Sequence, residues 1–384
     1  MPGEAYFHSQ NVIPLAMTAA SKAAPLITDS DTVKRLTKIW QELLGVGSIG
    51  LHENYFDLGG DSSLAVQLFS RIASVFKVQL PLATLFDAPT IAELAEVLHR
   101  EVSAPQWSPL VAIQPSGSRP PFFCMHGAGG NVLIYRDLSR YLGADQPFYG
   151  LQSQGLDGTS LPLGTIEEMA ALYVNEIRKV SPHGPYFLGG YCMGGTVAYE
   201  VAQQLCAQGE EIGLLALFDT MNWSNRRPVS AFDRTYHILQ RFLFHAANFL
   251  CLEYRGMSKF VWEKIATVRN RLPVWLGILL AKLDKHPSGS KSESRVLGDI
   301  WRTNDHACVK YVPRPYRGAV TDFRPIKQYR IYNRADVKWD RLARAQEIIV
   351  LPVYPAGMLA EPFVKNLAAV LRNSIDKAAL ARQS

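Results

Sequence analysis

A cysteine flanked by glycines is the first residue whose setting suggests catalysis. Residues 190–194 read Gly-Tyr-Cys-Met-Gly, behind an apolar run at 185–191 that predicts a strand and ahead of a helical pattern at 194–208. A strand, a sharp turn and a helix with this spacing form a nucleophile elbow, in which the glycines relieve crowding at the turn. We therefore predict that Cys192 is a nucleophile. We also expect the N-terminus of the following helix to favour its thiolate form.

A glycine-rich loop supplies further groups that acyl transfer needs. The apolar run at 121–125 predicts a strand, and the sequence His-Gly-Ala-Gly-Gly follows it at 126–130. In such folds the oxyanion is stabilised by one backbone N–H of this loop and one of the residue after the nucleophile. We predict Ala128 and Met193 as the two donors. His126 is a candidate base, although a histidine at this place more often orients the backbone.

A serine stands at the start of a second helical pattern. Residues 57–64 read Asp-Leu-Gly-Gly-Asp-Ser-Ser-Leu, and the two glycines allow a sharp turn before a helix that runs to Phe76. Free N–H groups at a helix N-terminus favour negative charge, so Ser62 is well placed to carry a phosphodiester. The same serine would equally serve as an N-cap, and the pattern leaves both interpretations open.

Residues 30–102 resemble the carrier domains of nonribosomal peptide and polyketide synthases, which carry 4′-phosphopantetheine on the serine of a G-G-[HD]-S-[LI] motif. Ser62 matches the modified serine, whereas Ser63 stands where Leu or Ile is usual. The resemblance implies an all-α four-helix domain with covalent 4′-phosphopantetheine. It also implies two kinds of partner, a phosphopantetheinyl transferase and other synthase modules or carrier proteins in trans.

Residues 121–378 resemble the type I thioesterases that end such assembly lines. This resemblance implies an α/β-hydrolase domain with a mainly parallel sheet, helices on both faces and an inserted helical lid at about 222–311. It assigns the catalytic acid to Asp219, which ends the apolar run at 212–219.

The family's catalytic histidine is missing from its expected place. The family pattern is G-x-H-x-x-M-L-x-E-P, whereas residues 353–362 read Val-Tyr-Pro-Ala-Gly-Met-Leu-Ala-Glu-Pro. Pro355 therefore stands where the histidine belongs, and no histidine follows His306.

The loss of this histidine predicts altered chemistry. In a hydrolase the histidine deprotonates the nucleophile and later activates the water that clears the acyl-enzyme. A cysteine relaxes the first requirement, because some thiolate exists at neutral pH, but the second remains. General-base catalysis is worth about 100- to 10,000-fold. We therefore predict that an acyl or aminoacyl thioester passes to Cys192 for transfer or release, with slow release to water.

Two other functions remain open from the sequence. Hydrolytic or cyclising chain release would need a relocated base, for which His306 and His126 are the candidates. A degenerate thioesterase that only docks carriers is the second alternative, although Cys192, its elbow and Asp219 are all retained. These residues do not specify the acyl, aminoacyl or peptidyl substrate.

The elements that position these groups alternate along the chain. Apolar runs that predict strands alternate with helical patterns, which is typical of a parallel sheet covered by helices. The strands are expected at 121–125, 185–191, 212–219 and 347–354, and the helices at 134–142, 166–180 and 194–208. Ahead of them, we expect a flexible segment at 1–28, the carrier domain at 29–102 and a linker at 103–120. The thioesterase-like domain then runs from 121 to 378.

Composition excludes several other classes. The 384 residues are 48% hydrophobic and 19% charged, which is typical of a folded chain and not of a disordered one. Five scattered cysteines without a C-x-x-C predict a reduced, cytoplasmic protein with no metal site. The sequence shows no signal peptide, and its longest apolar run is shorter than the roughly 20 residues that span a bilayer. We expect no membrane partner.

Charge is distributed unevenly along the chain. Residues 29–101 contain 10 acidic and 6 basic side chains, whereas residues 221–345 contain 24 basic and 10 acidic side chains. The basic region is either a set of solvated helix faces or a surface that attracts an acidic partner such as the carrier. No motif for reading nucleic acid accompanies this charge, so we expect no nucleic-acid partner.

Overall fold

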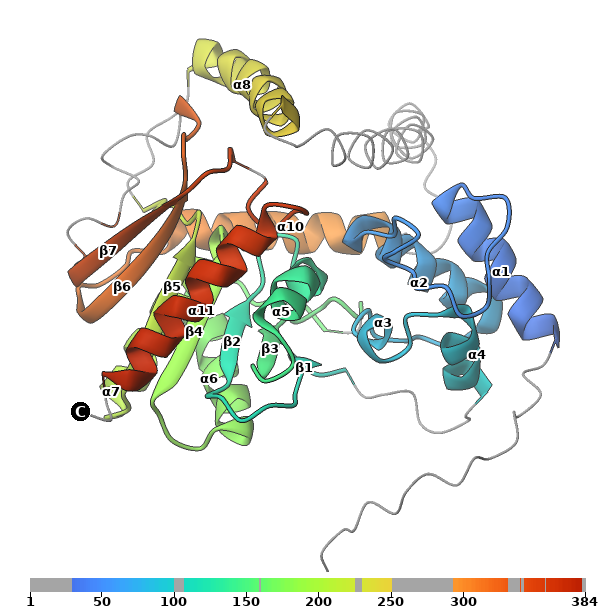
Figure 1. Cartoon of the computed structure of the whole chain (residues 1–384), viewed down its shortest axis with the longest axis horizontal. Coiled ribbons are helices and arrows are strands. Elements are labelled where there is room, and N and C mark those ends of the chain that lie inside the picture. The colour runs from blue at the N-terminus through green and yellow to red at the C-terminus, as the bar shows by residue number, and fades with distance from the viewer. Residues whose placement is uncertain are drawn as a thin grey trace, which may run out of the picture.

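The computed structural model describes residues 30–99, 107–158, 160–224, 230–250, 293–330, 339, 342–355 and 357–381 (Figure 1). The predicted N-terminal segment 1–28 and residues 251–292 of the predicted lid lie outside these ranges. Within them, the chain forms a helical domain followed by a larger domain of strands and helices, drawn in Figure 1 in blue and from green to red respectively.

The N-terminal domain is all-α, as expected. Its described residues form the four helices α1 (Ser30–Leu44), α2 (Ser62–Phe76), α3 (Thr84–Asp87) and α4 (Ile91–His99). Apolar side chains at helical spacing fill its core, because each helix buries one stripe. Leu36, Trp40, Leu68, Ile72 and Leu94 are among those with 0% exposure. A capping box opens α4, since Glu93 N–H donates to Thr90 Oγ1 at 3.2 Å and Thr90 N–H donates to Glu93 Oε2 at 3.1 Å.

The second domain is built on a mainly parallel sheet. Its strands are β1 (Leu110–Gln114), β2 (Phe122–Met125), β3 (Phe148–Leu151), β4 (Tyr186–Tyr191), β5 (Ile212–Phe218), β6 (Tyr316–Pro325) and β7 (Ala343–Leu351). They are ordered β1-β3-β2-β4-β5-β6-β7. Only β1 pairs antiparallel, with β3, and the other neighbours are parallel. The expectation of a carrier domain followed by an α/β domain is therefore confirmed.

The structure differs from the sequence expectation at residues 103–120. We expected a linker there, but Leu110–Gln114 forms the edge strand β1. Residues 115–120 contain two prolines and a glycine, and this composition masked the short strand. Only Val111 of β1 is buried, so the strand lacks the continuous apolar run of an inner parallel strand.

Helices cover both faces of the sheet. One core cluster joins it to α6 (Ile166–Val180), α7 (Met193–Ala207) and α10 (Glu293–Lys310). A second cluster joins its other face to the short helix η1 (Leu133–Tyr135), α5 (Arg136–Leu142) and α11 (Val364–Leu380). Neighbouring residues of β2 divide between the two clusters: Phe123 and Met125 belong to the first, and Phe122 and Cys124 to the second. This alternation is the two-residue period of a strand buried on both faces.

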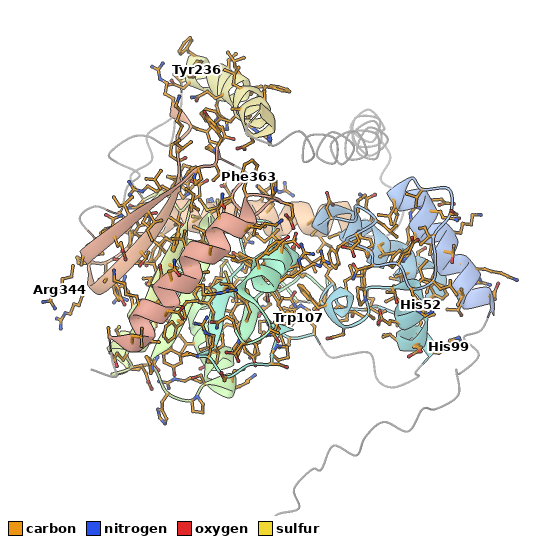
Figure 2. The ribbon with its side chains drawn as sticks, viewed as in Figure 1. His52, His99, Trp107, Tyr236, Arg344 and Phe363 are labelled. Carbon is orange, nitrogen blue, oxygen red and sulfur yellow. The ribbon has the colours of Figure 1, made fainter. Side chains whose placement is uncertain are left out.

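The lid helix α8 (Ala231–Leu250) lies beyond the carboxyl ends of the strands (Figure 1). Figure 2 shows Tyr236 on this helix and Arg344 at the amino end of β7, well apart along the strand direction. In parallel α/β folds, functional groups gather where the strands end, and this end carries the elbow.

Candidate active site

Cys192 occupies a sharp turn between β4 and α7. Its φ of 56° lies in the left-handed region that a side-chain-bearing residue rarely adopts. A Cβ on Gly190 would overlap the backbone of Gly194, and a Cβ on Gly194 would overlap the carbonyl oxygen of Met125. The two glycines therefore let the strand, the helix and the preceding β2 loop meet at the nucleophile, as the motif predicts.

Asp219 lies beside Cys192 at the end of the neighbouring strand. Tyr191 and Phe218 are register partners in the β4–β5 ladder, so Cys192 and Asp219 are the next residues along paired strands. The Cys192 N–H donates to the Phe218 carbonyl at 2.9 Å. Asp219 also adopts a positive φ, 46°. The tertiary structure thus brings together the predicted nucleophile and the predicted acid.

The thiol of Cys192 is harder to ionise than the sequence led us to expect. Burial and the negative charges of Asp219 and Asp305 raise its pKa to about 11, and the N–H of Met193 at the helix start only partly opposes them. At that pKa about one thiol in 10,000 is ionised at pH 7. The helix N-terminus alone therefore does not activate the cysteine, and a neighbouring group must accept the proton.

The carboxyl group of Asp219 has a pKa that is raised towards neutral pH. Burial raises its pKa to about 6, opposed by a hydrogen bond from Gln328 and reinforced by the charge of Asp322. Gln328 Nε2 donates to Asp219 Oδ1. A carboxylate with a pKa near 6 is a better proton acceptor than an ordinary aspartate, because general-base strength rises with pKa.

The predicted oxyanion donors lie on either side of the elbow. The pKa of Cys192 is lowered by a hydrogen bond from the Met193 amide, so this N–H reaches the sulfur. Ala128 lies in the β2 loop, where Asn304 Nδ2 of α10 donates to its carbonyl oxygen at 3.0 Å. Tyr135 ties this loop to the elbow, because its hydroxyl donates to Met125 O at 2.6 Å and accepts from Tyr191 N at 2.9 Å. These contacts fix both predicted donors in place, and their oxyanion role stays a prediction.

Neither predicted alternative base is set up for proton transfer with Cys192. His126 is fully buried, with Nδ1 2.7 Å from the Gly127 carbonyl and Nε2 2.8 Å from the Tyr173 hydroxyl. Burial lowers its pKa to about 4, so the ring is neutral and orients the backbone. His306 is exposed on α10, whereas its neighbour Ala307 is buried. Figure 2 shows two further histidines, at positions 52 and 99, in the carrier domain.

The loop that contains Pro355 is held against the lid helix. Asn248 of α8 accepts a hydrogen bond from Tyr354 N–H at 2.9 Å and donates from Nδ2 to Tyr354 O at 3.3 Å. Pro355 itself is buried. The segment that carries the histidine in the resembling family is therefore occupied here by a buried proline and a lid contact.

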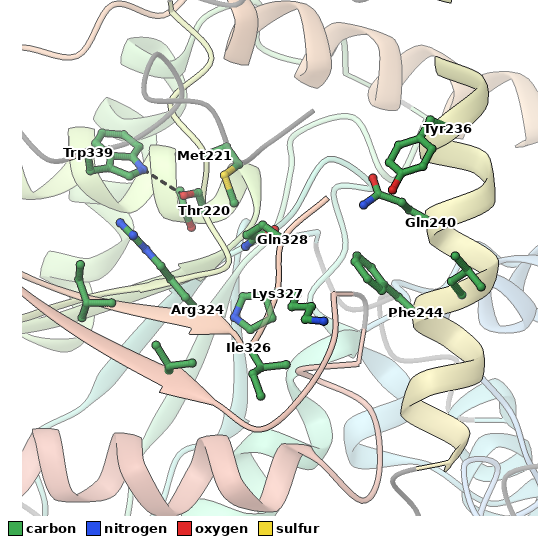
Figure 3. Close-up of a pocket in the computed structure, with 14 residues that line it drawn as sticks. Thr220, Met221, Tyr236, Gln240, Phe244, Arg324, Ile326, Lys327, Gln328 and Trp339 are labelled. Carbon is green, nitrogen blue, oxygen red and sulfur yellow. Dashed lines mark hydrogen bonds between the residues drawn. The ribbon is translucent and has the colours of Figure 1, made fainter. Parts of the chain in front are cut away.

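A cavity of about 560 Å³ lies between α8 and the ends of β6 and β7 (Figure 3), and Gln328, which donates to Asp219, lines it. Its lining includes Thr220, whose carbonyl accepts from Trp339 Nε1 at 3.1 Å, and also Phe244, Lys327 and Gln328. We did not predict this cavity or Gln328 from the sequence, because β6, the strand that ends beside them, has no sustained apolar run.

A lid histidine was also missed. His237 of α8 packs its ring against Tyr329, with centroids 4.5 Å apart. Burial and, to a smaller extent, the charge of Asp219 raise the pKa of Tyr329, against the opposing charge of Arg241. His237 stands among apolar residues of a helix, as a residue with a packing role would, so no pattern in the sequence distinguished it.

The carrier serine starts α2 without capping it. Asp61 Oδ1 accepts from Leu64 N–H at 2.8 Å, so Asp61 is the N-cap and Ser62 is the first helical residue. Gly59 has a φ of 90°, and a Cβ on Gly60 would collide with the ring of Tyr55. The two glycines therefore shape the loop, and the capping interpretation of Ser62 loses its basis. The side chains of Ser62 and Ser63 lie outside the described ones.

The two domains contact each other next to this loop. The guanidinium carbon of Arg136 on α5 lies 4.2 Å from the centroid of the Phe56 ring, and Nη2 lies 3.7 Å from Asp57 Oδ1. Leu133 is 5% exposed and packs into the carrier core, while Phe86 of α3 packs against the core of the larger domain. The carrier thus contacts the larger domain through the η1–α5 segment and also through α10, which belongs to the basic region 221–345.

No group of three or more His, Cys, Asp or Glu side chains is arranged to hold a metal ion in the described ranges. No described helix has the length and apolar character needed to cross a membrane.

Family models match both domains. Residues 34–98 match the phosphopantetheine attachment site, and residues 120–258 match the thioesterase domain. The carrier domain is therefore the attachment region for 4′-phosphopantetheine, and the larger domain has the thioesterase fold.

Similar proteins come from peptide assembly lines. Malpinin synthetase of Mortierella alpina is 45% identical over 187 residues, which is 48% of this chain and 2% of that protein. A dimodular nonribosomal peptide synthase of Bacillus subtilis (strain 168) is 43% identical over 184 residues, 48% of this chain and 8% of that protein. The chain thus spans less than a tenth of the length of these relatives. A crystal structure of a four-domain holo nonribosomal peptide synthetase, bound to AMP and glycine, is 25% identical with a TM-score of 0.55 and covers 94% of this chain and 27% of that chain.

Proposed function

Since the chain joins a phosphopantetheine carrier domain to a thioesterase domain of the nonribosomal peptide synthetase type, we propose that it passes an acyl or aminoacyl group through Cys192 to an acceptor and does not hydrolyse it. Two observations carry this proposal. Asp219 accepts a hydrogen bond from Gln328, and Pro355 stands at the family's histidine position.

Ser62 is the residue that would hold the cofactor. It is the first residue of α2, its neighbour Asp61 provides the cap, and the helix start favours a phosphodiester. Phosphopantetheine there would supply a thiol that carries the acyl group as a thioester. The fit supports modification by a phosphopantetheinyl transferase and loading by other synthase modules, which we propose as partners.

The docked carrier supports transfer within one chain. Phe56 and Asp57 lie in the loop that precedes Ser62, and both contact Arg136 of the thioesterase domain. This contact orients the start of α2 against the domain that contains Cys192. An intramolecular encounter raises the effective concentration of the thioester at the nucleophile, so loading in cis should exceed loading in trans.

Acyl loading needs a single proton shuttle. Cys192 Sγ attacks the thioester carbonyl, Asp219 accepts the thiol proton, and the N–H groups of Ala128 and Met193 stabilise the oxyanion. One thioester replaces another, so the exchange is close to neutral in free energy. The adjacent carboxylate, with its pKa of about 6, suffices for this step.

Release to water needs more than this pair. A water molecule is a weak nucleophile and needs its own general base on the acyl-enzyme, the role that histidine fills in a triad. Of the two histidines predicted as alternative bases, His126 is occupied by two hydrogen bonds and His306 is exposed. An amine acceptor is far more nucleophilic and reacts with a thioester as its neutral form. We therefore assign the acceptor to the amine or thiol class.

The direct test follows one acyl group by mass spectrometry. The whole chain is loaded at Ser62 with a small acyl-phosphopantetheine, and the position of the acyl group is mapped over time in the wild type, Cys192→Ala and Cys206→Ala. Cys206 is an exposed thiol at the end of α7 and serves as the matched control. We expect acylation of Cys192 that persists in water and clears when an amine is added. In Cys192→Ala the acyl group should stay on Ser62.

The other outcomes separate the alternatives. Rapid formation of free acid by the wild type, abolished in His306→Ala, would replace transfer with hydrolysis through a relocated base. Complete absence of acyl-Cys192 would leave a module that only docks carriers.

A further inference from the structure

Gln328 is a polar residue that the sequence did not single out and that the family pattern does not assign. It lies three residues beyond the end of β6, at the wall of the cavity, as Figure 3 shows. Its Nε2 donates to Asp219 Oδ1. Its Oε1 is buried and has no hydrogen-bond partner among the described residues. A buried amide oxygen without a hydrogen-bond donor lowers the stability of the fold. The contribution of this side chain is therefore its hydrogen bond to Asp219.

The backbone explains why an added hydrogen bond matters at Asp219. The residue lies just past the end of β5 with a φ of 46°, and its N–H donates to Phe323 O at 2.9 Å. The backbone is therefore held between β4 and β6, whereas the carboxyl group still rotates about its side-chain bonds. A donor on one oxygen removes that freedom and leaves the other oxygen to the neighbouring elbow.

We propose that Gln328 is a positioning residue, which holds the Asp219 carboxylate in the orientation that accepts the thiol proton of Cys192. The inference rests on the proposed function only for the identity of the acyl donor. In the acylation step the S–H proton moves to Asp219 and Sγ bonds to the thioester carbonyl carbon. The bond from that carbon to the donor sulfur breaks, and the proton passes from Asp219 to the departing thiolate.

The charges around Asp219 determine the direction in which its pKa should move in the test. Burial and Asp322 raise the pKa of Asp219, and the Gln328 hydrogen bond lowers it, because the N–H stabilises the ionised form. Removing the donor therefore raises this pKa further. Other charged or titratable groups also surround Asp219 and Cys192. They are Asp305 and Cys308 on α10, Tyr135 of η1, Tyr329 after β6, and Arg324, which binds Asp322 at 2.6 Å. None of them replaces the lost donor, since Arg324 already binds Asp322.

The experiment measures Cys192 reactivity against pH in the whole chain. Alkylation by iodoacetamide is mapped to the Cys192 peptide between pH 5 and 9, so the readout needs no acyl substrate. In the wild type we expect the alkylation rate to rise with a midpoint near pH 6, the pKa of Asp219. A second rise, due to free thiolate, should follow at higher pH. In Gln328→Leu the midpoint should move up by roughly one pH unit and the plateau should fall. Gln328→Asn keeps an amide N–H donor and adds no titratable group, so its midpoint should shift less than that of Gln328→Leu.

A second glutamine of the same cavity is the matched control. Gln240 of α8 accepts from Arg330 N–H at 2.9 Å, and Gln240→Leu should leave the midpoint unchanged. An unmoved midpoint in Gln328→Leu, or an equal shift in Gln240→Leu, would overturn the proposal. Acylation by a small thioester is then measured on the same variants. A wild type that never acylates but shows the alkylation shift would refute the transfer function and leave the role of Gln328 standing.

Discussion

Replacing Asp219 by asparagine should stabilise the thioesterase domain at neutral pH while removing its reactivity. The pKa of this carboxyl lies near 6 in the folded chain, against an ordinary value of 3.8, because burial penalises the ionised form. A raised acid pKa means that the folded state binds the proton more tightly than the unfolded state. Its stability is therefore greatest below about pH 4, falls as the pH rises towards 6, and stays at the lower level above that.

The size of the effect follows from this difference. About two pH units at 1.36 kcal/mol each give an upper bound of about 3 kcal/mol. Asp219 is only partly screened from solvent, so we expect about 1–2 kcal/mol. The amide of Asp219→Asn keeps an oxygen that accepts from Gln328, so the variant removes the charge and keeps the hydrogen bond.

Scanning calorimetry at pH 4.5, 6 and 7.5 checks the prediction. The thioesterase transition of Asp219→Asn should lie about 4 °C above that of the wild type at pH 7.5, and the gap should shrink towards zero at pH 4.5. Asp322→Asn is the control with the opposite sign, because Asp322 pairs with Arg324 at 2.6 Å and its loss should destabilise the domain. A gap that does not grow with pH would refute the raised pKa of Asp219 and the base role built on it.

Three further predictions concern docking, the elbow and the carrier helix. Arg136→Ala removes a cation–π contact worth about 1 kcal/mol, so it should slow acylation from the tethered carrier about fivefold and leave acylation from a free thioester unchanged. Arg140→Ala, on the same helix, should alter neither rate, and equal slowing from both sources would contradict the docking role. Gly190→Ala should lower the free energy of unfolding of the thioesterase domain by about 1–3 kcal/mol and abolish acylation, whereas Gly298→Ala, in a helix with open space around it, should not destabilise the domain. Asp61→Ala removes the α2 cap and should lower the carrier transition by about 4–8 °C; an unchanged transition would show that the cap is not needed.

Much of the fold could be predicted from local patterns. The helix expected at 166–180 coincides with α6, since its apolar residues recur at helical spacing and Thr165 caps it. The strands β3 and β6 were not predicted. β3 has four residues, and β6 contains an arginine and a glycine in its first half, so neither presents a sustained apolar run. Their place in the sheet comes from pairing with distant strands, which a local pattern does not encode.

The candidate site divides in the same way. The elbow around Cys192 was predictable, because the glycines that relieve crowding where the strand, the turn and the helix meet lie within five residues of one another. The ionisation of its thiol was not, since it depends on burial and on the carboxylates of Asp219 and Asp305. The orientation of Asp219 depends on Gln328, 109 residues further along the chain.

The sequence by itself determined the two chemical groups of this protein, the serine at a helix start and the cysteine in an elbow, together with the loss of the family's histidine. Those features are local, because a glycine's φ or a helix cap depends on residues within one or two turns. The tertiary structure decided which charges surround Cys192, what holds Asp219 and where the carrier docks. These depend on desolvation and on distances between remote segments, and only the packed chain sets both.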